Sequence, residues 1–179
     1  STGQLVEDGD PDVDVIANLL TADAVTTISL DTTVTTADLS TSGAGAIDID
    51  ETDAIVLFDV DTANGTITID AVGQVTAIDV ASLTDADAND INLATTVGSI
   101  VVTTVNAGTL GDATLTAATS ILDDGSAATV LTADVLIATA DGPITLDTTV
   151  ATADLSATGP GSIDIDETDA VVLSDVDAA

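Results

Sequence analysis

The sequence contains no lysine, arginine, histidine or cysteine, and only one of its 179 residues, Phe58, is aromatic. Thirty-two aspartate and glutamate residues therefore have no basic partner, and the formal net charge is −32. A surface of one negative sign repels nucleic-acid phosphates and anionic lipids, so neither is expected as a partner. The absence of cysteine removes disulfides as a source of stability.

The missing residue types also weigh against catalysis and membrane insertion. Serine has no histidine or lysine beside it to activate its hydroxyl, and there is no cysteine nucleophile. We therefore predict that the chain is not an enzyme. No apolar run approaches the roughly 20 residues of a membrane helix, so insertion into a bilayer is not expected.

Small aliphatic residues are abundant instead. Hydrophobic residues make up 45% of the chain, and they are almost entirely alanine, valine, isoleucine and leucine. This share is too high for a disordered acidic segment. Without large aromatic or methionine side chains a wide spherical core is hard to fill, so the composition favours a thin core packed in layers.

Apolar residues alternate with acidic or polar ones in short stretches, most clearly as IDID at 47–50 and 163–166. This period of two predicts strands with one buried face, and turn residues separate them. The strands begin at positions 28, 47, 67, 91, 113, 144 and 163. Strands recurring every ~20–25 residues indicate an all-β fold, a parallel β-solenoid. The side chains predicted to stack inside it are Ile28, Leu30, Ile47, Ile49, Ile67, Ile69, Ile144, Leu146, Ile163 and Ile165.

The chain also repeats over a longer distance. Residues 1–63 align with 117–179 at an offset of 116, and 28–63 match 144–179 at 27 of 36 positions. We predict one continuous solenoid segment over residues 1–179. The alternative, a tandem array of separate β-sandwich domains, would need linkers between units, and no Pro- or Gly-rich linker marks a 116-residue boundary.

Three blocks resemble the repeats of large filamentous-haemagglutinin-like bacterial exoproteins: NAGTLGDATLTAATSILDDGS at 106–126, LTADVLIATADGPITLDTTVATADLSATGPGSIDIDETDAVVL at 131–173, and DTANGTITIDAVGQVTAIDVAS at 61–82. The resemblance implies a right-handed parallel β-helix, secretion to the bacterial cell surface and a role in adhesion or extracellular fibres. We therefore expect an extracellular, stiff and acidic stalk that contacts cell-surface or matrix components. The alternative is a matrix or surface-layer protein whose assembly depends on Ca²⁺.

The residue after each inner pair should point outward, and in several coils it is aspartate. Because stacked coils lie ~4.8 Å apart, Asp31, Asp50 and Asp70 are expected to form a column, with Asp147 and Asp166 beginning its copy in the second unit. Neighbouring charges at this spacing repel by about 1–3 kcal/mol. Ca²⁺ prefers carboxylate oxygens and would bridge them, so these five residues are the candidate metal ligands and Ca²⁺ the candidate cofactor. A solvated acidic face screened by salt is the alternative. A second column is predicted through Asp38, Asp59 and Asp79.

Neither end of the sequence shows the polar cap of a natural solenoid end. An uncapped end exposes backbone groups and apolar side chains. We therefore expect the chain either to continue covalently as further units of 116 residues or to associate end to end with further copies of itself.

Overall fold

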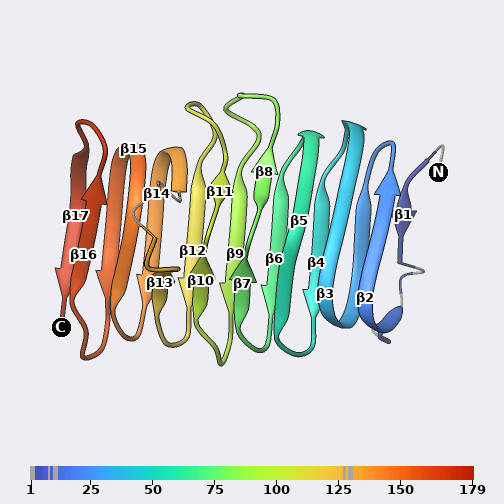
Figure 1. The fold of residues 1–179 in the computed structure, drawn as a ribbon, viewed down its shortest axis with the longest axis horizontal. Helices are drawn as coiled ribbons and strands as arrows, with labels where there is room; N and C mark the ends of the chain where they lie inside the picture. Colours follow the sequence, from blue (N-terminus) through green and yellow to red (C-terminus); the bar gives the residue numbers. More distant parts are fainter. Residues whose placement is uncertain (1–2, 8, 10–11, 127, 129–130) are drawn as a thin grey trace.

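The computed structural model describes residues 3–7, 9, 12–126, 128 and 131–179, and this part of the chain is all-β. It winds into about eight coils stacked along one axis, with the two termini at opposite ends (Figure 1). The pairings between neighbouring coils are parallel, which confirms the predicted β-solenoid. The strands are β1 (Leu5–Val6), β2 (Val15–Ala24), β3 (Ile28–Ala44), β4 (Ile47–Glu51), β5 (Ile55–Asn64), β6 (Ile67–Ala71), β7 (Val75–Ala77), β8 (Val80–Ser82), β9 (Ile91–Thr95), β10 (Ile100–Val102), β11 (Val105–Asn106), β12 (Ala113–Ala117), β13 (Ile121–Asp123), β14 (Leu131–Ala140), β15 (Ile144–Ala157), β16 (Ile163–Glu167) and β17 (Val172–Ala178).

Each coil contributes strands to two walls of the solenoid. Long strands turn the corner between them, since β3 pairs with β4 through its first residues and with β5 through its later ones. The first wall contains the in-register row Ile28, Ile47, Ile67, Ile91, Ala113, Leu136, Ala153 and Leu173. The second wall contains the row Ile55, Val75, Ile100, Ile121, Ile144 and Ile163.

The alternation of the sequence decides which side chains fill the space between the walls. In β4, Ile47 and Ile49 are at most 1% exposed, and the aspartates that follow them face solvent. Eight of the ten predicted inner side chains are buried in this way. Ile163 and Ile165 are only partly buried, because no further coil of the described chain covers the coil to which they belong. Phe58 is 55% exposed, and the core is aliphatic as predicted.

The repeat of 116 residues does not contain a whole number of coils. Five steps along the first wall lead from Ile28 to Leu136. Ile144, the copy of Ile28, lies half a coil further on and belongs to the second wall. The repeat therefore spans five and a half coils, and equal sequences occupy different walls.

Because of this half-coil offset, the strands that the sequence predicts do not all lie in one row. The strands beginning at 144 and 163 do not continue the row that runs from 28 to 113. Both walls bury every second residue, so the period of two cannot tell which wall a strand belongs to. Between positions 113 and 144 the chain first completes one coil, from Ala113 to Leu136, and then crosses to the other wall, where Ile144 lies.

Candidate functional site

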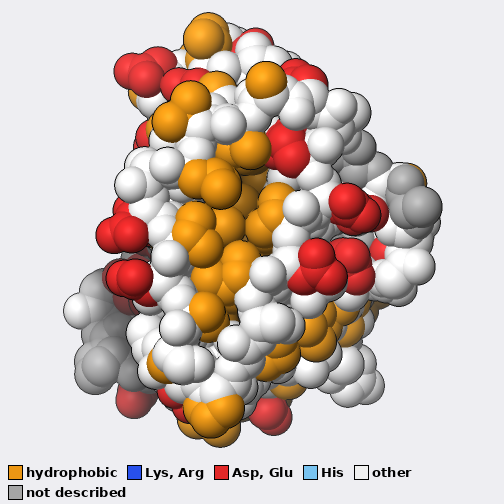
Figure 2. All heavy atoms as spheres, turned by 90° about the vertical axis from the view of Figure 1, so that its left-hand side faces the viewer, with side chains coloured by type: hydrophobic (Ala, Val, Ile, Leu, Met, Phe, Trp, Pro, Cys, Tyr) orange, Lys and Arg blue, Asp and Glu red, His pale blue; other side chains and the backbone are white. Residues whose placement is uncertain are grey.

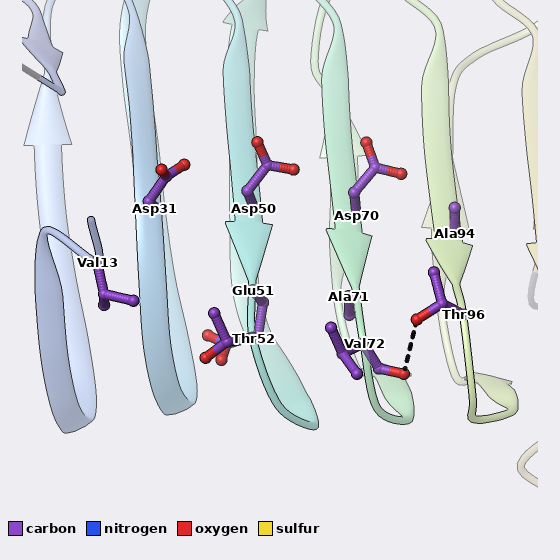
Figure 3. A pocket seen from close by; sticks show the side chains of 10 residues that line it. All are labelled: Val13, Asp31, Asp50, Glu51, Thr52, Asp70, Ala71, Val72, Ala94 and Thr96. Carbon is purple, nitrogen blue, oxygen red and sulfur yellow. Dashed lines mark hydrogen bonds between the residues drawn. The ribbon is translucent and has the colours of Figure 1, made fainter. Parts of the chain in front are cut away.

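Three of the predicted aspartates form a column on the first wall. Asp31 on β3, Asp50 on β4 and Asp70 on β6 are in-register partners, and the row then passes to Ala94 on β9. Figure 3 shows the three side chains projecting in the same direction from neighbouring strands. Their stacking is confirmed, and their role as metal ligands stays a prediction.

Asp147 and Asp166 form a separate pair. They stack on each other on β15 and β16, in the second wall. The half-coil offset of the repeat carries this copy of the Asp31–Asp50 pair away from the first column, so the five candidates form two groups. Desolvation raises the pKa of Asp147, and the charges of Asp123 and Asp166 raise it further.

A groove of about 330 Å³ runs along the first column. Its floor and rims combine carboxylates with methyl groups, and Val72 beside it is 45% exposed. The lining residues are Val13, Asp31, Asp50, Glu51, Thr52, Asp70, Ala71, Val72, Ala94 and Thr96 (Figure 3). The groove offers hydrogen-bond acceptors, negative charge and small apolar contacts, which suit a cation or a positively charged group with an apolar part.

Asp48 lies close to these negative charges, two residues before Asp50 on β4. Partial burial raises the pKa of Asp48, and the charges of Asp50, Asp70 and Asp31 raise it further. The sequence supplies no basic side chain to oppose this repulsion. Protonation or screening by dissolved ions would relieve this repulsion.

A second acidic group lies on the second wall. Asp38 and Asp59 are in-register partners, and the neighbouring pair Val60 and Val80 brings Asp79 beside them. Asp61, which is not among the predicted residues, also belongs to this group. Burial, then the charges of Asp59 and Asp79, then a hydrogen bond with Asp59, raise the pKa of Asp61 to about 6. Asp59 and Asp61 flank buried Val60, so the alternation of the sequence already placed both outside.

A buried carboxylate at the corner between the walls was not predicted. Glu51 is 2% exposed. Its carboxylate accepts hydrogen bonds from the Thr32 hydroxyl at 2.8 Å, from the Val34 N–H at 2.8 Å and from the Asp53 N–H at 3.0 Å. These donors come from β3 and from the turn after β4, so Glu51 joins two successive coils at their corner.

The second unit contains the same arrangement. Glu167, the copy of Glu51, accepts from the Thr148 hydroxyl at 2.8 Å, from the Val150 N–H at 3.3 Å and from the Asp169 N–H at 3.4 Å. The sequence could have predicted the inward direction of both glutamates, because each ends an IDIDE strand at a position where the alternation points inward. Neutral O–H and N–H groups of the protein satisfy the carboxylates of Glu51 and Glu167, so each side chain holds a corner between the two walls.

The candidate ligands form one column of three aspartates and one pair. Among the residues that the structure describes, no three acidic side chains are arranged to hold a metal ion together. A cation at the first column would therefore bridge two neighbouring coils and take its other ligands from water.

Comparison with protein-family models, with curated proteins and with solved structures finds no match to this chain. The similarity to filamentous-haemagglutinin-like exoproteins thus rests on the sequence blocks alone. The described residues include no helix of the length and hydrophobicity that crossing a membrane requires.

Proposed function

We propose that this chain is a structural segment of a secreted bacterial surface adhesin or extracellular filament, in which it forms a stiff acidic stalk. The observation that carries the proposal is the single core. Buried side chains of both walls form one cluster that runs from Ala24 in the first coils to Leu155 near the C-terminal end. Bending this stack of coils would separate neighbouring coils, which are joined by parallel strand pairing and by core contacts. The solenoid therefore resists bending.

The outer surface suits a position outside the cell. Negative charge without any positive counterpart keeps neighbouring stalks soluble and apart. The absence of lysine and arginine leaves no trypsin site. Partners on the cell surface or in the matrix would be cationic themselves or would be bridged to the stalk by cations.

Antibodies raised against this chain test the location and the form of the protein. Labelling of intact, unpermeabilised cells, with immunogold particles along thin surface projections, is the expected result. Permeabilised cells provide the control for total protein. Labelling that appears only after permeabilisation would contradict the proposal.

A Ca²⁺-dependent matrix or surface-layer protein is the second candidate function. It is favoured by the column of Asp31, Asp50 and Asp70 along the groove of the first wall. Calorimetric titration with Ca²⁺ at physiological ionic strength tests it. A saturable heat that Asp50→Asn reduces is expected if the column binds Ca²⁺ at a defined site, and a heat that Mg²⁺, Na⁺ and Ca²⁺ share would contradict a defined site.

A further inference from the structure

The groove of the first wall runs along the axis of the solenoid and crosses the strands. Its lining comes from β3, β4, β6 and β9, which are in-register neighbours in successive coils. Two rows of side chains border it, one of aspartates and one nearer the turns (Figure 3): Asp31, Asp50 and Asp70, and Thr52, Val72 and Thr96. A ligand in the groove would therefore have carboxylates along one side and methyl groups along the other.

Two buried residues of the lining lie between these rows in the sequence. Ala71 is 3% exposed, and the carboxylate of Glu51 is already engaged by donors of the protein. Val72 keeps 45% of its surface exposed at the rim. The lining is thus largely apolar, and the negative charge that a ligand can reach lies on the row of aspartates.

Negative charge alone does not select this groove, because acidic side chains lie on several sides of the solenoid. Figure 2, a view along the long axis, shows them around apolar side chains. The chain has no lysine or arginine, so a second copy cannot supply a cationic side chain. The occupant is therefore a cationic molecule of another kind, which the spacing of the carboxylates and the apolar contacts must select.

The spacing of the row fits one class of cation. Successive coils place its carboxylates ~4.8 Å apart. Nitrogen atoms that are separated by three methylene groups lie about 5 Å apart in an extended chain, since four bonds of ~1.5 Å join them in a zigzag. Three ammonium groups at this spacing can each donate to one aspartate while the methylene groups contact Val72 and the threonine methyl groups.

We propose that the groove of the first wall binds a linear polyamine with three-methylene spacers. The polyamine lies along the solenoid axis, with one ammonium group beside each of Asp31, Asp50 and Asp70. Linking the three ammonium groups in one molecule makes the second and third contacts intramolecular, which raises the affinity above that of separate monovalent cations.

An extended basic peptide fits the row less well. Lysines on one face of an extended chain recur at every second residue, about 6.8 Å apart, and fall out of step with carboxylates ~4.8 Å apart. A single bridging metal ion would serve two neighbouring carboxylates and leave the third. The polyamine would compete with Ca²⁺ for the same column, and its binding goes beyond the stalk role.

Isothermal titration calorimetry of the full chain at neutral pH and ~0.15 M NaCl tests the site with norspermidine, a triamine with two three-methylene spacers. One saturable site is expected. Bis(hexamethylene)triamine carries the same number of amines on longer spacers and should bind at least about tenfold more weakly, because its ammonium groups cannot meet three neighbouring carboxylates. In methyl NMR spectra the Val72 resonances should shift with norspermidine, whereas those of exposed Ile137 on β14 should not.

Two variants locate the binding. Asp50→Asn removes the middle carboxylate and should weaken norspermidine binding about tenfold. Asp141→Asn removes one exposed charge at a turn outside the groove, so it is the matched control and should leave the Kd unchanged. Far-UV circular dichroism verifies that both variants fold.

A preference for norspermidine that Asp50→Asn alone reduces supports the proposal. Equal affinities for the two triamines, or equal weakening by the two variants, would reduce the binding to diffuse charge attraction and overturn it. Tighter binding of the peptide Lys-Ala-Lys-Ala-Lys would assign the groove to a basic peptide and also overturn it. Absence of the protein from the cell surface would contradict the stalk role, and absence of a Ca²⁺ heat would contradict the calcium candidate; neither result would change these affinities.

Discussion

Replacement of Glu51 by alanine should destabilise the solenoid more than any other substitution of an acidic residue in the described chain. The carboxylate is 2% exposed and accepts three hydrogen bonds of 2.8, 2.8 and 3.0 Å. Alanine would leave the Thr32 hydroxyl and the Val34 and Asp53 N–H groups without their acceptor. Each buried donor without an acceptor costs about 1–3 kcal/mol, and water entering the vacated corner recovers part of that loss. We expect the free energy of unfolding to fall by about 3–5 kcal/mol.

Glu167→Ala is the matched control for this substitution. Glu167 occupies the equivalent corner, but it is only half-buried, and its longer hydrogen bonds measure 3.3 and 3.4 Å. Water can replace the carboxylate there, so we expect a loss of about 1 kcal/mol. Glu51→Gln keeps the size of the side chain and one acceptor oxygen, and its effect should lie between those of the two alanine variants.

Urea unfolding followed by far-UV circular dichroism measures these free energies. Equal losses for Glu51→Ala and Glu167→Ala would refute the argument, because it derives the difference from burial. A loss below about 1 kcal/mol for Glu51→Ala would also refute it, since one unsatisfied buried donor already accounts for that much.

Three further predictions concern cations, protons and the coil as a structural unit. Millimolar Ca²⁺ should raise the melting temperature more than NaCl of equal ionic strength, because a bridging ion relieves adjacent carboxylates more fully than screening does. Asp50→Asn should shrink that difference and Asp141→Asn, at a turn, should not; equal melting temperatures in the two salts would favour the salt-screened face. The folded-state pKa of Asp61 is about 6, above its ordinary 3.8, so the stability gained from its protonation is full below that ordinary value and is lost as the pH rises through about 6. Lowering the pH from about 7 to about 5 should therefore raise the melting temperature; Asp61→Asn should weaken this rise, whereas Asp177→Asn, its exposed copy, should leave it unchanged. Deletion of residues 67–90 removes one whole coil and lets Ile91 stack on Ile47, so circular dichroism should show a folded β protein. Deletion of Thr68 alone moves the residues after it in β6 to the opposite face and should destabilise the chain more than the deletion of the whole coil; the reverse order would contradict the assigned register.

The sequence determined the strands and their buried faces. The alternation in IDIDE places Ile47, Ile49 and also Glu51 inside and the aspartates outside, because successive side chains of any strand point to opposite sides. The turn-separated spacing of these strands indicated stacked coils, and the aliphatic composition indicated a thin core. The same local rule implied the stacking of Asp31, Asp50 and Asp70 and would have identified the buried carboxylate of Glu51.

Only the tertiary structure decided which wall each strand occupies. Coils differ in length, from 19 residues between Ile28 and Ile47 to 24 between Ile67 and Ile91. A given number of residues therefore does not always advance the chain by the same fraction of a turn around the axis. After 116 residues the accumulated phase is five and a half coils, which moves Asp147 and Asp166 away from the first column. The period of two is the same in both walls, so it carries no information about this phase. Position around a solenoid is set by pairing register between coils, and that register exists only once the chain has folded.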